Sequence, residues 1–148
     1  MKYEQLKLDN QICFPLYAAS RLVIREYQPM LDKLGITYPQ YLVLLVLWEQ
    51  NGQPVNDIAK KLILNTNTIT PLLKRLETQG IVTRERSKED ERKVIVLLTE
   101  KGKALQDEAS CIPMQLAAGM QATDVTTEDL AELKNQLHAF IDFMKKKA

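Results

Sequence analysis

The segment CFPLY contains the residues with the clearest capacity for chemistry, Cys13 and Tyr17. A cysteine thiolate is a nucleophile that oxidants convert to sulfenic acid, and a nearby phenol can stabilise it by donating a hydrogen bond. The chain has only two cysteines, Cys13 and Cys111, and one histidine, which are too few and too far apart for a zinc site. Cys13 is therefore either a redox-active residue or an inert core thiol.

The CFPLY segment lies near the start of a long predicted helix. Apolar residues recur at three- and four-residue steps over residues 11–34, which is the spacing of one helical face. Asp9 or Asn10 can cap the start, and Pro15 fits in the first turn, where its missing N–H matters least. Gly35 ends the predicted helix.

This placement affects the ionisation of the Cys13 thiol in two opposing ways. The helix dipole near the N-terminus and the phenol of Tyr17, one turn away, favour the thiolate. Three apolar neighbours oppose ionisation by desolvation but suit an apolar substrate: Ile12, Phe14 and Leu16. The sign of the net pKa shift stays open at this point.

The middle of the chain predicts a helix-turn-helix. Thr37 is the expected N-cap of a buried helix, YLVLLVLWE, which Asn51-Gly52 closes. A short helix, PVNDIAKKL, follows with Asn56 as its expected cap, and the connector Ile63-Leu64-Asn65 leads into a second helix that ends at Gly80. Two short helices with so tight a link are typical of a helix-turn-helix.

The residues after Gly80 predict a wing. The β-branched runs IVTRER and KVIVLLT are separated by the charged loop SKEDER, which indicates a two-stranded hairpin. A helix is expected after Thr99, and a last amphipathic helix after Thr126 or Thr127.

The predicted fold is mainly α: a winged helix-turn-helix with a small β-hairpin wing, and N- and C-terminal helices that form a dimerisation region. Residues 37–102 are the expected DNA-binding region, and residues 1–36 and 103–148 the dimerisation helices, all within one continuous structural domain. A homodimer in which the terminal helices interleave would bury their apolar faces.

A winged helix-turn-helix places its second helix in the major groove of DNA and its wing near phosphates or the minor groove. The candidate contacts on the helix are Thr66, Asn67, Thr68, Thr70, Lys74 and Arg75. Those on the wing are Arg84, Arg86, Asp90, Arg92 and Lys93, with Arg92 as the minor-groove residue and Asp90 orienting an arginine. The alternative is that the threonines and asparagine only cap a helix and the charges belong to a solvated loop. A dimer would present two such helices about 34 Å apart, which predicts an inverted-repeat operator and salt-sensitive affinity.

Composition excludes other classes of protein. With 20 Lys and Arg against 19 Asp and Glu the net charge is +1, so any basic surface must be local. No apolar run is long enough to span a membrane, and the start of the chain does not resemble a signal peptide, so we expect a cytoplasmic protein. The chain has no Gly-rich phosphate loop and no C-x-x-C pair that would recycle a thiol peroxidase, so we expect neither a cofactor nor an enzyme.

The run LLKRLETQGIVTRERSKEDERKVIVLLTEKG, residues 72–102, resembles the MarR family of dimeric winged-helix repressors. The D-x-R motif of that family corresponds to Asp90-Glu91-Arg92, and its LT-x-x-G helix start to residues 98–102. Three further stretches, CFPLYAASR, LGITYPQYLVLLVLWE and NTITPLLKRLE, resemble the organic hydroperoxide resistance regulators.

That resemblance implies that Cys13 senses organic hydroperoxide, with help from tyrosines of the partner subunit, which by position are Tyr17 and Tyr27. Cys13 and Tyr27 are fourteen residues apart, about 21 Å along a helix, so within one chain they cannot touch. Tyr27 must therefore act from a second, antiparallel subunit. Tyr38 and Tyr41 either line the same pocket, with Phe14 and Leu16, or pack the core.

Oxidised Cys13 has two expected fates. Some members of the family use a resolving cysteine from the partner chain, and Cys111 is the only candidate here, although it lies earlier than the resolving cysteine of the family. Otherwise a small cellular thiol would cap Cys13. Two alternatives remain: a MarR-type repressor that responds to a reversibly bound aromatic acid, with Cys13 not a sensor, and a winged helix that binds only protein.

Overall fold

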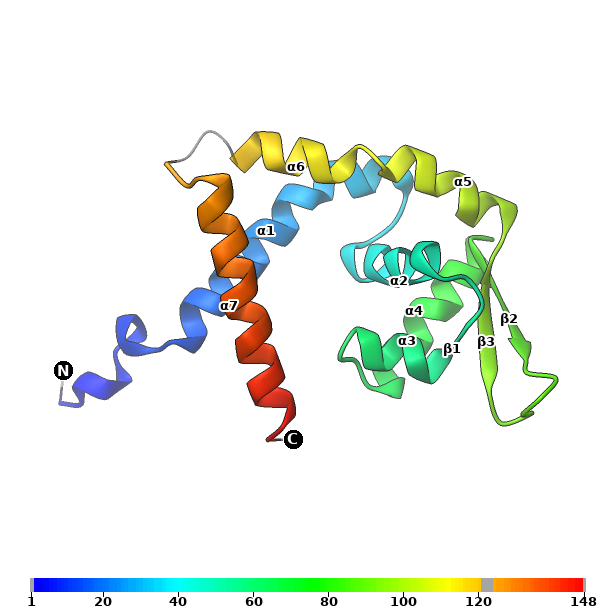
Figure 1. The fold of residues 1–148 in the computed structure, drawn as a ribbon, viewed down its shortest axis with the longest axis horizontal. Helices are drawn as coiled ribbons and strands as arrows, with labels where there is room; N and C mark the ends of the chain where they lie inside the picture. The colour runs from blue at the N-terminus through cyan, green and yellow to red at the C-terminus, as the bar shows by residue number, and fades with distance from the viewer. Residues whose placement is uncertain (1, 121–123, 148) are drawn as a thin grey trace. The chain divides into compact units, whose positions relative to one another are not determined.

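The computed structural model describes residues 2–120 and 124–147 (Figure 1). The chain divides into two compact units, Met1–Ile112 and Pro113–Ala148. The first contains helices α1 to α5 and a three-stranded sheet, and the second contains most of α6 and all of α7. No helix in the described ranges is long and apolar enough to cross a membrane.

Helix α1 (Cys13–Leu34) begins two residues later than predicted and ends where predicted, at Gly35. Gly35 has a φ of 67°, a left-handed conformation that glycine adopts without steric penalty. The predicted N-caps, Asp9 and Asn10, are wrong, because both residues belong to a short 3₁₀ helix, η2 (Leu8–Asn10).

The side chain of Asn10 is used elsewhere in the N-terminal segment. Its Nδ2 donates to the carbonyl oxygen of Glu4, at 2.7 Å, in a second 3₁₀ helix, η1 (Glu4–Leu6). Ile12 occupies the N-cap position of α1 and has no side-chain oxygen to offer. The first turn of α1 therefore lacks a side-chain cap.

Helix α2 (Tyr38–Glu49) is the centre of the core. Thr37 is its N-cap, as predicted, and the Thr37 N–H donates to Gln40 Oε1 at 2.8 Å. Three of its side chains are completely buried: Val43, Leu44 and Leu47. A helix that is apolar around most of its circumference needs neighbours on every side, which α1, α3, α4 and α5 supply.

Helices α3 (Val55–Lys61) and α4 (Thr66–Thr78) form the helix-turn-helix. Ile58 of α3 and Ile69 and Leu73 of α4 belong to the same hydrophobic core, and all three are completely buried. Asn65 caps α4, because its Oδ1 accepts the Thr68 N–H at 2.9 Å.

The predicted cap of α3, Asn56, is wrong. Pro54 holds the N-cap position, with an extended backbone, because it belongs to strand β1 (Gln53–Pro54) and the chain passes from strand to helix without a linker. This strand was not predicted, since two residues that include a proline give no periodicity.

Strands β2 (Val82–Arg86) and β3 (Val94–Leu98) are the two strands of the predicted wing. The sheet order is β1-β3-β2, and both pairings are antiparallel, with Arg84 opposite Val96. The wing therefore starts from a sheet that is anchored on both sides of β3.

Helix α5 (Glu100–Ala109) follows β3 directly, and Thr99 is its N-cap, as predicted. Thr99 Oγ1 accepts the Gly102 N–H at 3.1 Å. A Cβ on Gly102 would lie 2.2 Å from the carbonyl oxygen of Ile81, so the close packing of α5 on the start of the wing requires glycine.

The second unit contains helices α6 (Ile112–Met120) and α7 (Thr127–Lys145). Helix α6 was not predicted separately, and Pro113, its second residue, needs no backbone donor there. Thr126 caps α7, in agreement with the prediction, because its Oγ1 accepts the Asp129 N–H at 3.1 Å. Apolar residues recur along α7, and several are exposed: Leu133, Phe140, Ile141, Phe143 and Met144.

Candidate nucleic-acid interface and thiol site

The N-terminal turns of α4 present short polar side chains. Thr66, Asn67 and Thr68 are exposed, and Thr70 is half-buried. Thr70 Oγ1 donates to the Thr66 carbonyl oxygen at 2.8 Å. The first N–H groups of a helix carry partial positive charge, so this end of α4 favours an anion or an acceptor on a base edge.

Two exposed cations follow on the same helix, Lys74 and Arg75. Because residues four apart lie on one face of a helix, Thr66, Thr70 and Lys74 form a continuous row. A row of small hydrogen-bonding residues followed by a cation suits a helix that lies along a duplex groove.

The wing loop is shaped by Asp90. Its Oδ1 accepts the backbone N–H of Arg92 at 3.1 Å and lies 3.5 Å from Arg92 Nε. The Lys93 N–H donates to the Asp90 carbonyl oxygen at 2.8 Å. The side chain of Arg92 is nevertheless 95% exposed, so Asp90 orders the loop and leaves the guanidinium facing solvent.

Arg84 differs from the other wing cations. Its Nε and Nη2 both donate to Glu77 Oε2 of α4, at 3.0 and 2.6 Å, and its side chain is only 24% exposed. Arg86, Arg92 and Lys93 are exposed. The structure therefore places Arg84 between the helix and the wing rather than on the outer surface.

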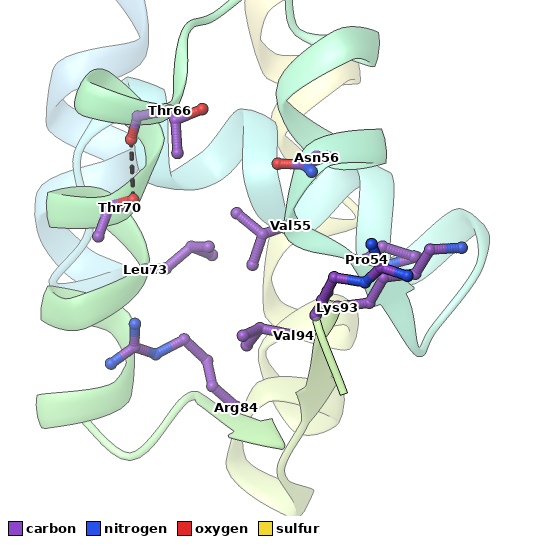
Figure 2. A pocket seen from close by; sticks show the side chains of 10 residues that line it. Pro54, Val55, Asn56, Thr66, Thr70, Leu73, Arg84, Lys93 and Val94 are labelled. Carbon is purple, nitrogen blue, oxygen red and sulfur yellow. Dashed lines mark hydrogen bonds between the residues drawn. The ribbon is translucent and has the colours of Figure 1, made fainter. Parts of the chain in front are cut away.

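A hollow of about 240 Å³ lies between α4, the start of α3 and the wing (Figure 2). Its apolar side chains are Pro54, Val55, Leu73 and Val94, and its polar ones include Thr66, Thr70, Arg84, Arg92 and Lys93. This hollow separates the two elements that the sequence assigns to DNA contact.

Cys13 is the first residue of α1, and its side chain is exposed. Phe14 and Leu16 are also exposed, which leaves an accessible apolar surface around the thiol. Tyr17, one turn along, already has a partner: its hydroxyl accepts a hydrogen bond from Arg21 Nη1 at 3.0 Å, and the guanidinium carbon lies 5.4 Å from the ring centre. Tyr17 is thus bound to a cation on its own helix.

Tyr27 forms an aromatic cluster with Tyr38 and Tyr41, which we call the tyrosine cluster. Its ring centre lies 5.0 Å from that of Tyr38 and 5.9 Å from that of Tyr41. Trp48 continues the contacts, with its ring centre 6.2 Å from that of Tyr41 and its indole N–H donating to the Gly102 carbonyl oxygen at 2.9 Å.

Burial raises the pKa of all three phenols in the tyrosine cluster. The neighbouring phenols add to the effect for Tyr27 and Tyr41, because two phenolates side by side would repel each other. The cluster therefore consists of neutral phenols at neutral pH. The sequence left open whether Tyr38 and Tyr41 line a pocket or pack the core, and the structure packs both against Tyr27.

Cys111 lies in the turn between α5 and α6, and its side chain is exposed. Its thiol donates to the Glu108 carbonyl oxygen, with a sulfur–oxygen distance of 3.4 Å. Among the described residues, no group of three or more His, Cys, Asp or Glu side chains could hold a metal ion.

Comparison with known proteins places this geometry in a family. The family model described as transcriptional regulator SarA/Rot matches residues 25–109, which include the helix-turn-helix and the wing. The organic hydroperoxide resistance transcriptional regulator of Bacillus subtilis (strain 168) is 45% identical over 146 residues, which cover 99% of this chain and 97% of that protein. The chain belongs to the MarR family of winged-helix transcriptional regulators.

Solved structures agree with the MarR assignment. The structure of reduced AbfR bound to DNA is 39% identical, with a TM-score of 0.74, and the match covers 97% of this chain and 99% of that one. AbfR is a protein of Staphylococcus epidermidis. Its disulfide-formed structure is 40% identical, with a TM-score of 0.60, and the match covers 99% and 95% of the two chains. Like its MarR relatives, the chain is a DNA-binding transcriptional regulator and not an enzyme.

Two features of this MarR protein were not found from the sequence. The partner of Arg84 is Glu77, and a glutamate in the last turn of a helix gives no sign of which cation it meets. The contact of Trp48 with Gly102 joins residues 54 positions apart, which no local pattern reveals.

Proposed function

We propose that the chain is a homodimeric repressor that binds an inverted-repeat operator and releases it when organic hydroperoxide oxidises Cys13. The observation that carries this proposal is an exposed cysteine at the first residue of α1, in a chain 45% identical along its length to an organic hydroperoxide resistance regulator. Residues 37–102 form the DNA-binding region, and residues 1–36 and 103–148 the dimerisation helices.

In the proposed complex, α4 enters the major groove and the wing reaches the minor groove. The exposed side chains of Thr66, Asn67 and Thr68 support contacts near the helix N-terminus, with Thr70, Lys74 and Arg75 following. Arg92 supports a minor-groove contact, because its guanidinium is exposed while Asp90 orders the loop that carries it. Arg86 and Lys93 contact phosphates.

The proposed sensing step is nucleophilic attack by the Cys13 thiolate on the terminal oxygen of the hydroperoxide. A sulfur–oxygen bond forms and the O–O bond breaks, which gives sulfenic acid and an alkoxide that takes a proton to become the alcohol. Sulfur loses two electrons and the peroxide gains them. The exposed apolar side chains of Phe14 and Leu16 favour an organic over an inorganic peroxide.

The phenols that assist the thiolate come, in this proposal, from the second copy. Cys13 and Tyr27 are too far along one helix to meet, so an antiparallel pair of α1 helices would bring the thiol of one copy to the tyrosine cluster of the other. Burial raises the pKa of Tyr27 and Tyr38, so both phenols stay neutral and keep the O–H that a hydrogen bond to a thiolate requires.

Sulfenic acid at Cys13 then condenses with a second thiol and releases water, which gives a disulfide. The partner thiol is Cys111 of the other subunit or a small cellular thiol. Either product adds bulk or a cross-link at the dimer interface, which changes the spacing of the two α4 helices.

The decisive experiment is a gel-shift with DNA from upstream of the chain's own gene, with and without cumene hydroperoxide. We expect the parent protein to release DNA on oxidation and the Cys13→Ser variant to bind equally well but not to respond. The Cys111→Ser variant identifies the second thiol, because it removes the disulfide only if Cys111 is that thiol, and the intact mass of each oxidised protein tells a disulfide from a small-thiol adduct. Release from DNA by the Cys13→Ser variant would refute thiol sensing.

A second candidate function is repression relieved by a reversibly bound aromatic acid, with Cys13 not involved. The hollow between α4 and the wing favours it, because apolar residues lie beside basic ones (Figure 2). Under this alternative the Cys13→Ser variant responds to the acid as the parent protein does, and hydroperoxide has no effect on either.

A further inference from the structure

Arg84 and Glu77 connect the recognition helix to the wing. Glu77 lies in the last turn of α4 and Arg84 in the middle of β2, and only a short turn through Gly80 separates the two elements. The two hydrogen bonds from Arg84 converge on one carboxylate oxygen of Glu77, at 3.0 and 2.6 Å. They therefore span the point at which the wing can rotate relative to α4.

The direction of the Arg84 side chain sets it apart from a phosphate contact. Figure 2 shows its guanidinium reaching from β2 towards α4, across the hollow from Lys93. Arg84 also forms an ion pair with a carboxylate of another element, Glu77 of α4. Arg92, by contrast, pairs with Asp90 of its own loop. A guanidinium with both of these donors committed has less to offer a phosphate.

We propose that Arg84 and Glu77 act as a brace that fixes the angle between wing and recognition helix, so that Arg84 positions the DNA-contacting residues without itself contacting DNA. The inference rests on the DNA-binding half of the proposed function and is independent of thiol sensing. It replaces the expectation that Arg84 contacts DNA.

The geometry of the wing makes such a brace effective. With a strand rise of about 3.3 Å per residue, the loop tip lies on the order of 16 Å beyond Arg84, so a rotation of about 10° at the base moves the tip by about 3 Å. A movement of that size exceeds the tolerance of a hydrogen bond and would take Arg92 away from its groove.

Electrostatics support the same conclusion. Hydrogen bonding from Arg84 is the largest of the effects that hold the pKa of Glu77 below its ordinary value, so the carboxylate is charged at neutral pH. The positive charge of Arg84 and the negative charge of Glu77 then cancel, so the pair presents no net charge to the duplex. A phosphate contact would release a counterion and add to the salt dependence of binding, whereas a neutral pair would not.

The test measures binding of the full chain to DNA from upstream of its own gene, across a range of salt concentrations. We expect Arg84→Gln to weaken binding about tenfold with an unchanged slope of log K against log salt, while the control Arg86→Gln, which removes a proposed phosphate contact, lowers the slope by about 0.9. A loss of slope in Arg84→Gln like that of the control would overturn the brace.

Two further variants distinguish a brace from a contact by the sign of the effect. Glu77→Gln should weaken binding about threefold if the pair is a brace, but strengthen it and steepen the slope if Glu77 merely competes with phosphate for Arg84. The charge-reversed pair, Glu77→Arg with Arg84→Glu, should recover binding to within about threefold of the parent, since a brace works in either direction.

Thermal unfolding of each variant checks that the fold is intact. If the charge-reversed protein fails to fold, the Glu77→Gln variant decides between the two explanations: weaker DNA binding supports the brace, and stronger DNA binding refutes it. A folded reversed pair that does not recover binding refutes the brace. Failure of the parent protein itself to bind DNA would instead refute the proposed function.

Discussion

At the scale of single residues, the tyrosine cluster shows how packing prepares a group for chemistry. Tyr27, Tyr38 and Tyr41 come from two helices, and the Tyr27 and Tyr38 rings are centred only 5.0 Å apart. Burial favours the neutral phenol in each. The cluster thus supplies hydrogen-bond donors that persist well above neutral pH.

This shift predicts a dependence of stability on alkaline pH. Because the folded-state pKa values are raised above 10.0, the cluster stabilises the fold fully below pH 10.0, and that contribution is lost as pH rises through the folded values. Phenolate absorbance in an alkaline titration should show a delayed fraction, which Tyr41→Phe reduces by about one third. If these phenols ionise with the pKa of free tyrosine, the shift is absent.

Residue types and spacing predicted part of the candidate site. Cys13 and Tyr17 were recognisable because a four-residue step places both on one helical face. The sequence did not reveal three contacts: the hydrogen bond from Arg21 to Tyr17, the packing of Tyr27 on Tyr38, and the ion pair of Glu77 with Arg84. These contacts depend on competing partners and on how helices cross, and both are decided by tertiary packing.

At the scale of elements, the contact between α5 and the start of the wing is the tightest constraint. We expect Gly102→Ala to lower the free energy of unfolding by about 2 kcal/mol, because the new Cβ would lie 2.2 Å from the Ile81 carbonyl oxygen. Urea denaturation measures the change.

Gly119→Ala is the matched control for this substitution. Gly119 also lies in a helix, α6, but a Cβ there would have nothing within 4 Å. Alanine should therefore leave stability unchanged or raise it by up to about 1 kcal/mol, since alanine favours helix. Equal effects at the two positions would contradict the packing argument.

Elements with strong periodicity were predictable, whereas short or strained ones were not. The two helices of the helix-turn-helix and both wing strands were expected, since their apolar spacing is regular. Strand β1 and the cap of α3 were missed, because both depend on pairing with β3. The turn between α3 and α4 contains Ile63 with a φ of 56°. A β-branched residue rarely adopts this left-handed conformation, so the sequence does not predict it.

At the scale of the whole molecule, each unit leaves apolar side chains exposed. The first has Ile12, Leu16 and Leu22 on or next to α1, and the second has Phe140 and Ile141 on α7. Exposed apolar residues at this density on amphipathic helices indicate a partner surface, which the proposed homodimer would cover.

We therefore expect Phe140→Glu to dissociate the proposed dimer, because it buries a charge in an apolar interface. Light scattering after size-exclusion chromatography should report the monomer mass, and binding to an inverted repeat should fall more than binding to a single half-site. Asn135→Glu, at an exposed polar position of the same helix, should remain dimeric. A dimeric Phe140→Glu protein would exclude α7 from the interface.

Trp48 gives the molecule a built-in optical probe. It is the sole tryptophan of the chain, its ring centre lies 6.2 Å from that of Tyr41, and its indole N–H is bonded to Gly102 at the base of α5. Excitation absorbed by the three phenols is transferred over these short separations to one indole. Fluorescence from Trp48 therefore reports both on the packing of the tyrosine cluster and on the position of α5, with no added label.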